Sequence, residues 1–308
     1  MRTFQKTALI VASMMLGVGL IVSAFALILT GCDFEKLDTE NFETKTYEVT
    51  EEFQNIDISG LESDIRFVHA DDGQCKIVCK ESENIFCNIF VDNGTLTVKR
   101  KDVREGIMRG VFWEEELEIT VYLPKNRYKT VSLHTMSGDI KIPMGFYFDH
   151  LSAETTSGSI FAEAVTDREA SLKSVSGDMT FVPFGNATTS DSVKMETTSG
   201  DITVRSVNTK KFDLQTVSGD ISFDRIYSNT LNLETTSGDA EFESIEFYEK
   251  MTLKTTSGDV EGSVLSAKHF KTKTVSGDIR VPSSDANAPI FEIQTTSGDI
   301  EITVEAGE

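Results

Sequence analysis

The chain has 308 residues, with 50 acidic and 29 basic side chains and a formal net charge of −21. Acidic residues outnumber basic ones about twofold in residues 131–308. This balance argues against a nucleic acid or an anionic membrane surface as the partner of that region.

Residues 1–32 differ in composition from the rest of the chain. Arg2 and Lys6 precede an uncharged, largely apolar run over residues 7–31. This pattern predicts an export or anchor segment, because about 20 such residues span a bilayer. The run ends in Leu-Thr-Gly-Cys, which resembles the lipobox of bacterial lipoproteins, and the resemblance implies lipid attachment at Cys32. A cleaved lipoprotein signal and an uncleaved transmembrane helix both stay open. Both anchor the chain in the cell membrane with its body outside the cytoplasm.

Residues 33–45 are mostly polar and predict a tether. Residues 46–130 alternate as β-strands do, and Asn93-Gly94 is a hairpin signal. The expected strands lie near residues 55–59, 64–68, 75–80, 86–91, 95–100 and 116–123. We expect this N-terminal β portion to cover one end of the repeats that follow, so that their strand edge cannot pair with another molecule.

Three cysteines lie in this portion. Cys75 and Cys79 share one strand face and would lie about 13 Å apart, too far for a disulfide. Cys79 and Cys87 could pair across a hairpin that turns at residues 81–84. Burial as free thiols is the favoured interpretation, the redox state of this pair stays open, and the spacing fits no zinc site.

A basic cluster precedes two aromatic residues. Its members are Lys99, Arg100, Lys101, Arg104 and Arg109, followed by Phe112 and Trp113. A solvated hairpin loop is one interpretation. The other is a surface-contact loop for lipid headgroups, an anionic wall polymer or a partner protein.

The phrase Thr-x-Ser-Gly-Asp-Ile, or a close variant, occurs nine times between residues 131 and 300. Its glycines are Gly138, Gly158, Gly177, Gly200, Gly219, Gly238, Gly258, Gly277 and Gly298. So short and regular a period predicts a solenoid, in which each repeat is one coil that stacks on the preceding one.

The residues around each glycine predict the shape of a coil. Positions seven and five before it are apolar and alternate with polar residues, with Thr272 as the exception, and position two after it is again apolar. This alternation predicts a strand, a Ser-Gly-Asp corner where glycine supplies positive φ, and a second strand. The Thr or Ser three before the glycine predicts a structural ladder, and apolar pairs such as Ile245 and Phe247 predict a return wall.

An aspartate follows the glycine in every repeat except at Ser159. The column consists of Asp139, Asp178, Asp201, Asp220, Asp239, Asp259, Asp278 and Asp299. A solvent-exposed structural ladder is the favoured interpretation, because like charges about 4.8 Å apart in water repel weakly. Calcium binding is the alternative, although one aspartate per coil is sparse for an ion that takes six to eight oxygens.

Several segments together resemble the LiaG-like putative adhesin family. They are residues 93–98, Phe112-Trp113 followed by glutamates, the strand at 117–124, and the serial Ser-Gly-Asp-Ile phrases. The resemblance covers residues 46–304. It implies a bacterial β-strand-repeat domain of unknown function that is membrane-anchored and faces outward, with no catalytic residues to assign.

Taken together, these patterns predict an all-β chain. An anchor at 1–32 and a tether at 33–45 precede an N-terminal β portion at 46–130 and a nine-coil parallel β-solenoid of about 20 residues per coil at 131–304. We expect a non-catalytic, adhesin-like or cell-wall-contacting surface without cofactor or metal. An accessory protein of a cell-envelope stress-sensing system is the alternative, with a membrane protein of the same cell as partner. A polysaccharide-active enzyme is remote, because His69, His134, His150 and His269 are scattered and no hydrolase motif occurs.

Overall fold

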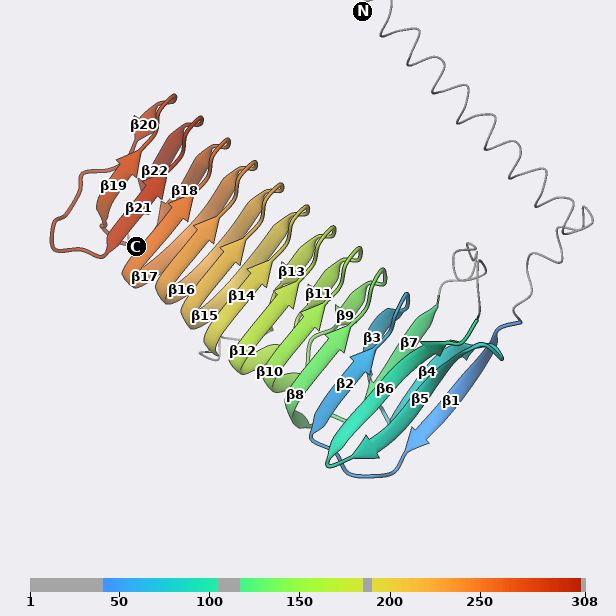
Figure 1. Ribbon diagram of the computed structural model, residues 1–308. Helices are drawn as coiled ribbons and strands as arrows, with labels where there is room; N and C mark the ends of the chain where they lie inside the picture. The colour runs from blue at the N-terminus through green and yellow to red at the C-terminus, as the bar shows by residue number, and fades with distance from the viewer. Residues whose placement is uncertain (1–40, 105–116, 185–189, 306–308) are drawn as a thin grey trace, which may run out of the picture. The chain divides into compact units, whose positions relative to one another are not determined.

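The computed structural model describes residues 41–104, 117–184 and 190–305. The chain divides into two units, Met1–Phe42 and Glu43–Glu308, and the second holds all 22 described strands. Within the described residues the fold is all-β, a parallel β-solenoid built coil on coil, as the sequence predicts (Figure 1). The described part of the chain contains no helix long and apolar enough to cross a membrane. The expected anchor at 1–32 lies outside the described residues.

The N-terminal strands form a first coil and a two-layered cap that covers it. The strands are β1 (Glu43–Val49), β2 (Asn55–Ser59), β3 (Asp64–His69), β4 (Cys75–Glu81), β5 (Ile85–Asp92), β6 (Thr95–Asp102) and β7 (Glu118–Leu123). Strands β2 and β3 make the first coil. One layer of the cap consists of β6 and β5 beyond β2, and the other consists of β7, β4 and β1 beyond β3. We call β1 and β4–β7 the cap.

Two expectations about this region are wrong. Strand β1 begins at Glu43, inside the segment expected to be a tether, because its residues pair with β4 over its whole length. The expected hairpin at residues 81–84 does not form, because β4 pairs with β1 and β7 whereas β5 pairs with β6. The chain instead crosses at this point from one layer of the cap to the other.

The repeats supply the remaining strands. They are β8 (Arg127–His134), β9 (Ile140–Ile142), β10 (Tyr147–Glu154), β11 (Ile160–Ala162), β12 (Val165–Lys173), β13 (Met179–Phe181), β14 (Ser190–Glu196), β15 (Ile202–Gln215), β16 (Ile221–Glu234), β17 (Ala240–Lys254), β18 (Val260–Val264), β19 (His269–Lys273), β20 (Ile279–Arg280), β21 (Ile290–Gln294) and β22 (Ile300–Val304). Neighbouring coils pair in parallel, and their inward columns form one continuous hydrophobic core.

The long strands β15–β17 each pass around two sides of a coil. They bend at Ser206, Arg225 and Ser244, which have φ values between 53° and 58°. Beyond the bend, Ile245 and Phe247 are fully buried and form the predicted return wall. A coil is therefore a closed turn with apolar side chains from all its walls directed inward.

The last two repeats do not stack in sequence order. Strand β21 lies between β17 and β19, and β22 lies between β18 and β20. The expectation that each coil stacks on the preceding one is wrong here. The coil of the final repeat, β21 and β22, lies between β17 and β18 on one side and the penultimate repeat, β19 and β20, on the other. Thr272, the polar exception in the inward column, therefore belongs to the terminal coil and is half-buried. Lys271 and Lys273 lie on the same outermost strand, where lysines disfavour pairing with another chain.

Each corner glycine is required by the neighbouring coil. A Cβ atom added at any of the nine would lie 1.9–2.3 Å from a backbone oxygen of the adjacent corner. Among the nine, only Gly219 and Gly277 have positive φ, and their 158° is nearly extended. The expectation that these glycines supply left-handed turns is wrong, since their function is to let two backbones approach closely.

Hydroxyl side chains join the same corners. In eight coils the Thr or Ser three before the glycine donates a hydrogen bond of 3.1–3.4 Å to the glycine carbonyl of the adjacent corner. The donors are Thr155, Ser174, Thr197, Thr216, Thr235, Thr255, Thr274 and Thr295. This column is the structural ladder that the sequence predicts.

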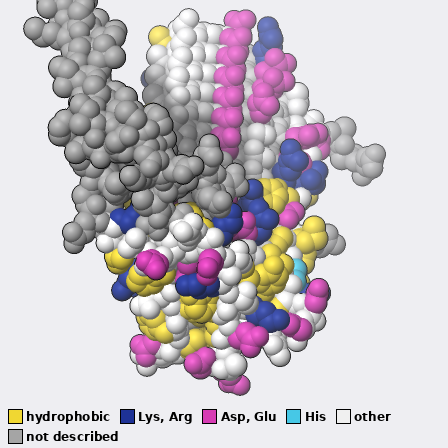
Figure 2. Space-filling model, turned by 90° about the vertical axis from the view of Figure 1, so that its right-hand side faces the viewer, with side chains coloured by type: hydrophobic (Ala, Val, Ile, Leu, Met, Phe, Trp, Pro, Cys, Tyr) yellow, Lys and Arg dark blue, Asp and Glu magenta, His cyan; other side chains and the backbone are white. Residues whose placement is uncertain are grey.

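The aspartate column bonds coil to coil as well. From Asp64 onward, an Oδ1 atom accepts the backbone N–H of the equivalent residue in the next coil at 2.7–2.9 Å. Ser159 interrupts the row because it has no carboxylate to offer Asp178. Acidic side chains follow one another in rows along the rod (Figure 2). Because one oxygen of every aspartate in the column except Asp278 caps a backbone amide, the geometry favours the structural interpretation over calcium binding.

Two polar contacts join the C-terminal coils. Lys268 is fully buried, and its Nζ donates to Glu246 at 2.5 Å. Glu305 accepts hydrogen bonds from Ser263 at 2.5 Å and Ser244 at 2.8 Å, which lower the pKa of its carboxyl.

Candidate functional site

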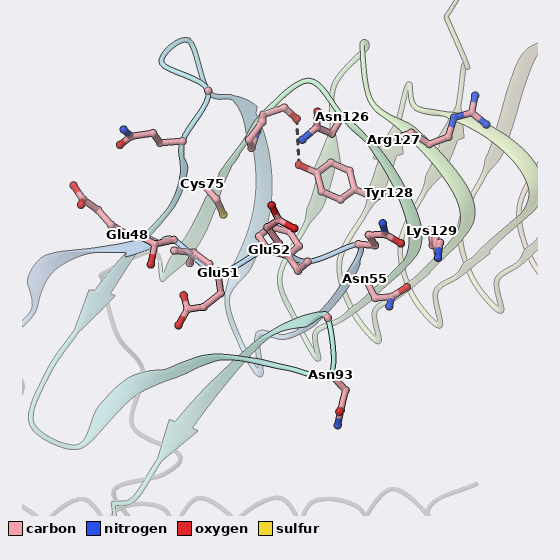
Figure 3. Close-up of a pocket in the computed structure, with 18 residues that line it drawn as sticks. Glu48, Glu51, Glu52, Asn55, Cys75, Asn93, Asn126, Arg127, Tyr128 and Lys129 are labelled. Atoms are coloured by element: carbon pink, nitrogen blue, oxygen red, sulfur yellow. Dashed lines mark hydrogen bonds between the residues drawn. The ribbon is translucent and has the colours of Figure 1, made fainter.

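A groove of about 1020 Å³ lies at the end of the cap (Figure 3). Four connections line it: the β1–β2 segment, the β3–β4 loop, the β5–β6 turn and the β7–β8 segment. We call this feature the cap groove. It brings together residues that are up to about 80 positions apart in the sequence.

Backbone hydrogen bonds fix these connections to one another. Asn93 and Gly94 both have positive φ, 48° and 71°, as the predicted two-residue hairpin turn requires. The Gly94 carbonyl accepts the N–H groups of Gln54 and Asn55 at 3.0 and 3.1 Å. The N–H of Lys129 donates to the Gln54 carbonyl at 2.8 Å. The groove is therefore built on a fixed backbone.

The floor of the groove is apolar and aromatic. The rings of Phe53 and Tyr128 stack with centroids 5.9 Å apart, and the Tyr128 hydroxyl donates to the Pro124 carbonyl at 3.2 Å. Burial raises the pKa of Tyr128, so the phenol stays neutral at physiological pH. Burial likewise raises the pKa of the Cys75 thiol to about 12. Neither group is an anion near neutral pH.

The rim is polar and mixed in charge. Carboxylates and amides dominate it, with two cations on one side: Glu48, Glu51, Glu52, Gln54, Gln74, Asn126, Arg127 and Lys129 are all exposed. Arg127 forms ion pairs with Asp149, at 3.6 Å, and with Asp167, which direct its charge towards the neighbouring coils. Amide and carboxylate groups above an aromatic floor suit an uncharged polar ligand better than an anion.

Comparison with protein families gives a match at residues 53–221 and again at residues 171–308. The chain belongs to the Toastrack DUF4097 family. The narrower LiaG-like assignment stays a prediction. Among curated proteins, none matches this sequence.

Several solved structures are similar to this chain at low sequence identity. A putative adhesin from Bacteroides fragilis NCTC 9343 is 15% identical, with 85% of this chain and 97% of that chain covered and a TM-score of 0.44. A putative lipid binding protein from Parabacteroides distasonis ATCC 8503 is 14% identical, with 86% and 98% covered and a TM-score of 0.48. A putative adhesin from the same Parabacteroides strain is 16% identical, with 86% and 98% covered and a TM-score of 0.44.

The structure separates the predicted basic cluster of this Toastrack chain. Lys99 and Lys101 are exposed on β6, whereas Arg100 and Arg104 are 4% and 8% exposed. The expectation of a loop of exposed cations is wrong for these two arginines, because Arg100 continues the inward column of Leu96 and Val98. Arg104 bonds Asp102 through both its backbone and its side chain. Cys32, Arg109, Phe112 and Trp113 lie outside the described residues.

The histidines occupy separate environments in this Toastrack chain. Nε2 of His69 contacts the Met144 carbonyl at 2.7 Å, and His269 contacts Ser284. His134 and His150 each lie 3.8 Å from a different glutamate. A histidine joined to both a serine and a carboxylate, as in hydrolytic triads, does not occur in the described part of the chain.

One cluster in the described residues has metal-ligand chemistry. The ligand atoms of Cys79, Glu81 and Cys87 lie within 4.8 Å of one another, and all three residues are buried in the cap. Sequence reasoning identified the two cysteines but missed Glu81 and the cap groove. The alternation of Cys75, Ile77, Cys79 and Glu81 along one strand face is the sequence signal that Glu81 points inward beside the cysteines. The groove has no such signal, because it depends on contacts between connections that are distant in the sequence.

Proposed function

We propose that this chain is a non-catalytic, membrane-anchored binding protein that holds an uncharged glycan of the cell surface in the cap groove. The observation that carries the proposal is the convergence of four connections on one groove with a polar rim and an aromatic floor. Sugars have both hydroxyl groups and C–H faces, and such a groove offers partners for both.

The repeats support this proposal by contrast. Their threonine hydroxyls and one oxygen of most column aspartates are used in bonds between coils. The repeated polar groups therefore make the rod, and the cap provides the locally distinct surface.

Glycan binding is tested with the full-length protein in detergent and uncharged N-acetylglucosamine oligosaccharides. Gln74→Ala combined with Asn126→Ala removes two exposed rim amides and should weaken binding at least fivefold. Asn287→Ala, at the other end of the rod, is the matched control and should leave binding unchanged. Equal binding by all three proteins, or preference for a phosphate-rich wall polymer, would contradict the proposal.

The anchor and the class of partner need separate experiments. Metabolic labelling with a lipid precursor should mark the wild type and not Cys32→Ser, and an unlabelled wild type would contradict lipid attachment. Crosslinking on intact cells should recover wall glycan. Recovery of a membrane protein of the same cell instead would favour the accessory role in envelope-stress sensing.

A further inference from the structure

A buried polar cluster lies between the two layers of the cap, away from the cap groove. Cys79 of β4 and Cys87 of β5 face each other across the layers, with sulfur atoms within 4.8 Å of each other. Arg100 of β6 is the register partner of Cys87. Exposed fractions are 1% for Cys79, 7% for Cys87, 1% for Glu81 and 4% for Arg100. We call these four residues the thiol cluster.

The carboxylate of Glu81 already has its partners. Its Oε1 accepts the N–H of Cys87 at 2.8 Å, and its Oε2 accepts the Tyr47 hydroxyl at 2.7 Å. Lys45 Nζ lies 3.3 Å from the same Oε2. A metal ion bound by Cys79, Glu81 and Cys87 would have to displace these contacts beside two cations, Lys45 and Arg100. The electrostatics therefore disfavour a metal site.

The guanidinium of Arg100 is only partly satisfied. Its Nη1 donates to the Lys80 carbonyl at 3.0 Å, whereas Nε and Nη2 are buried with no hydrogen-bond partner. A buried charged donor without an acceptor is destabilising. A thiolate at Cys87, the neighbour of Arg100 across the β5–β6 ladder, would supply the missing acceptor and neutralise the charge.

The two thiols have different acidities. A hydrogen bond from Cys79, together with the charge of Arg100, lowers the pKa of Cys87. The same hydrogen bond and burial raise the pKa of Cys79. The pair thus has one thiol with a lowered pKa and one with a raised pKa, which is the arrangement of an attacking and a resolving cysteine.

We propose that Cys79 and Cys87 are a redox-active pair that closes into a disulfide between the two layers of the cap, with Arg100 stabilising the thiolate of Cys87. The Cys87 thiolate attacks an external disulfide such as oxidised glutathione, whose S–S bond breaks and releases one thiolate. Cys79 loses its proton to solvent and attacks the Cys87 sulfur, which expels the second thiolate. Two electrons pass from the cysteine sulfurs to the reagent, and the two protons of the dithiol go to solvent.

The disulfide would change the edge of the cap. Among the described strands, β5 pairs only with β6, so it is the outermost strand of its layer. A covalent link to β4 would hold this strand against the opposite layer. This inference does not depend on the proposed glycan binding, because it concerns different residues and a different readout.

Peptide mapping of the full-length protein after incubation with oxidised glutathione tests the link directly. Trypsin places Cys75, Cys79 and Cys87 in three separate peptides, residues 67–76, 77–80 and 81–99. The proposal predicts a disulfide between 77–80 and 81–99, unchanged in Cys75→Ser. Absence of this link, or one zinc ion retained per chain with both cysteines protected from alkylation, would overturn the proposal.

Alkylation rates test the role of Arg100. At pH 7, iodoacetamide should label Cys87 at least tenfold faster than Cys75, because the thiolate fraction changes tenfold per pKa unit. Arg100→Met should slow labelling of Cys87 by about tenfold, and Arg100→Lys should restore most of the rate. The Cys87 to Cys75 ratio in the wild type provides the test even if Arg100→Met does not fold. Equal rates at the two cysteines would overturn the proposal.

Discussion

Replacement of a corner glycine tests how the coils fit together. In Gly238→Ala the new Cβ would lie 2.1 Å from the Gly219 carbonyl oxygen, a backbone atom that no rotamer change can move. An ordinary contact is about 3.4 Å, so the two coils must separate by about 1 Å. Gly238 has no left-handed φ, so its own backbone conformation tolerates alanine.

The magnitude follows from the bonds that this separation stretches. Three of the bonds that join these coils at the corner are Thr235 Oγ1 to Gly219 O at 3.3 Å, Ser237 N to Val217 O at 3.0 Å, and Asp239 N to Asp220 Oδ1 at 2.8 Å. At about 1 kcal/mol each, with about 1–3 kcal/mol of packing strain, the loss in unfolding free energy is about 4–6 kcal/mol. The melting temperature should fall by about 10–20 °C.

Gly73→Ala is the matched control. Gly73 has a φ of 70° and no heavy atom within 4 Å of an added Cβ, so only its backbone conformation resists the change. This substitution should lower the free energy of unfolding by about 1 kcal/mol and the melting temperature by about 2–4 °C. Thermal unfolding followed by circular dichroism compares the two variants. A Gly238→Ala protein that melts no lower than Gly73→Ala would refute the close-approach explanation.

Three further predictions concern the ladders and the C-terminal coils. Asp220→Asn keeps an oxygen acceptor for the Asp239 amide and should leave the melting temperature nearly unchanged, whereas Asp220→Ala should lower the free energy of unfolding by about 1 kcal/mol. A chelator should leave the melting temperature of the wild type unchanged. A large drop in that temperature with chelator would favour a calcium ladder. Lys268→Met should lower the free energy of unfolding by about 3 kcal/mol, because it leaves Glu246 without its buried partner. Adding Glu246→Met should recover most of that loss in denaturant titrations. No recovery in the double variant would contradict a charge-based cause. Glu305 has a lowered pKa in the folded state, so its stabilising contribution is present above the unfolded pKa and is lost as pH falls through the folded one. Glu305→Gln should therefore flatten the decline in melting temperature below about pH 4, and an identical pH profile would contradict this.

The sequence predicts the solenoid because each coil repeats the same local pattern. Alternation around every glycine assigns the inward columns, and the buried side chains of Leu231, Leu233 and Ile221 lie where the pattern places them. The ladder of threonines follows from the same columns. What could not be read from the pattern is which coils are neighbours, since the columns of β19 and β21 fit equally well in either order.

The remaining errors have local causes. A sequence suggests turn geometry for the glycine column, because it shows the corner and not the adjacent backbone that approaches it. The charge of Arg100 favours a surface loop, whereas its alternation with Leu96 and Val98 places it inward, as the structure has it. The cap groove needs four connections to meet, and no periodicity encodes that. By contrast, Thr272 was visible as an irregular residue, and the structure explains it as part of the terminal coil.

The central claim is that the rod is a structural stack and that binding occurs in the cap groove. Hydrogen–deuterium exchange of the full-length protein, with and without uncharged N-acetylglucosamine oligosaccharides, measures both parts together. The account predicts new protection in residues 50–54, 73–74, 93–94 and 124–129, with no change at the corners of the repeats. Protection spread along the repeat corners, with none in these four segments, would contradict it.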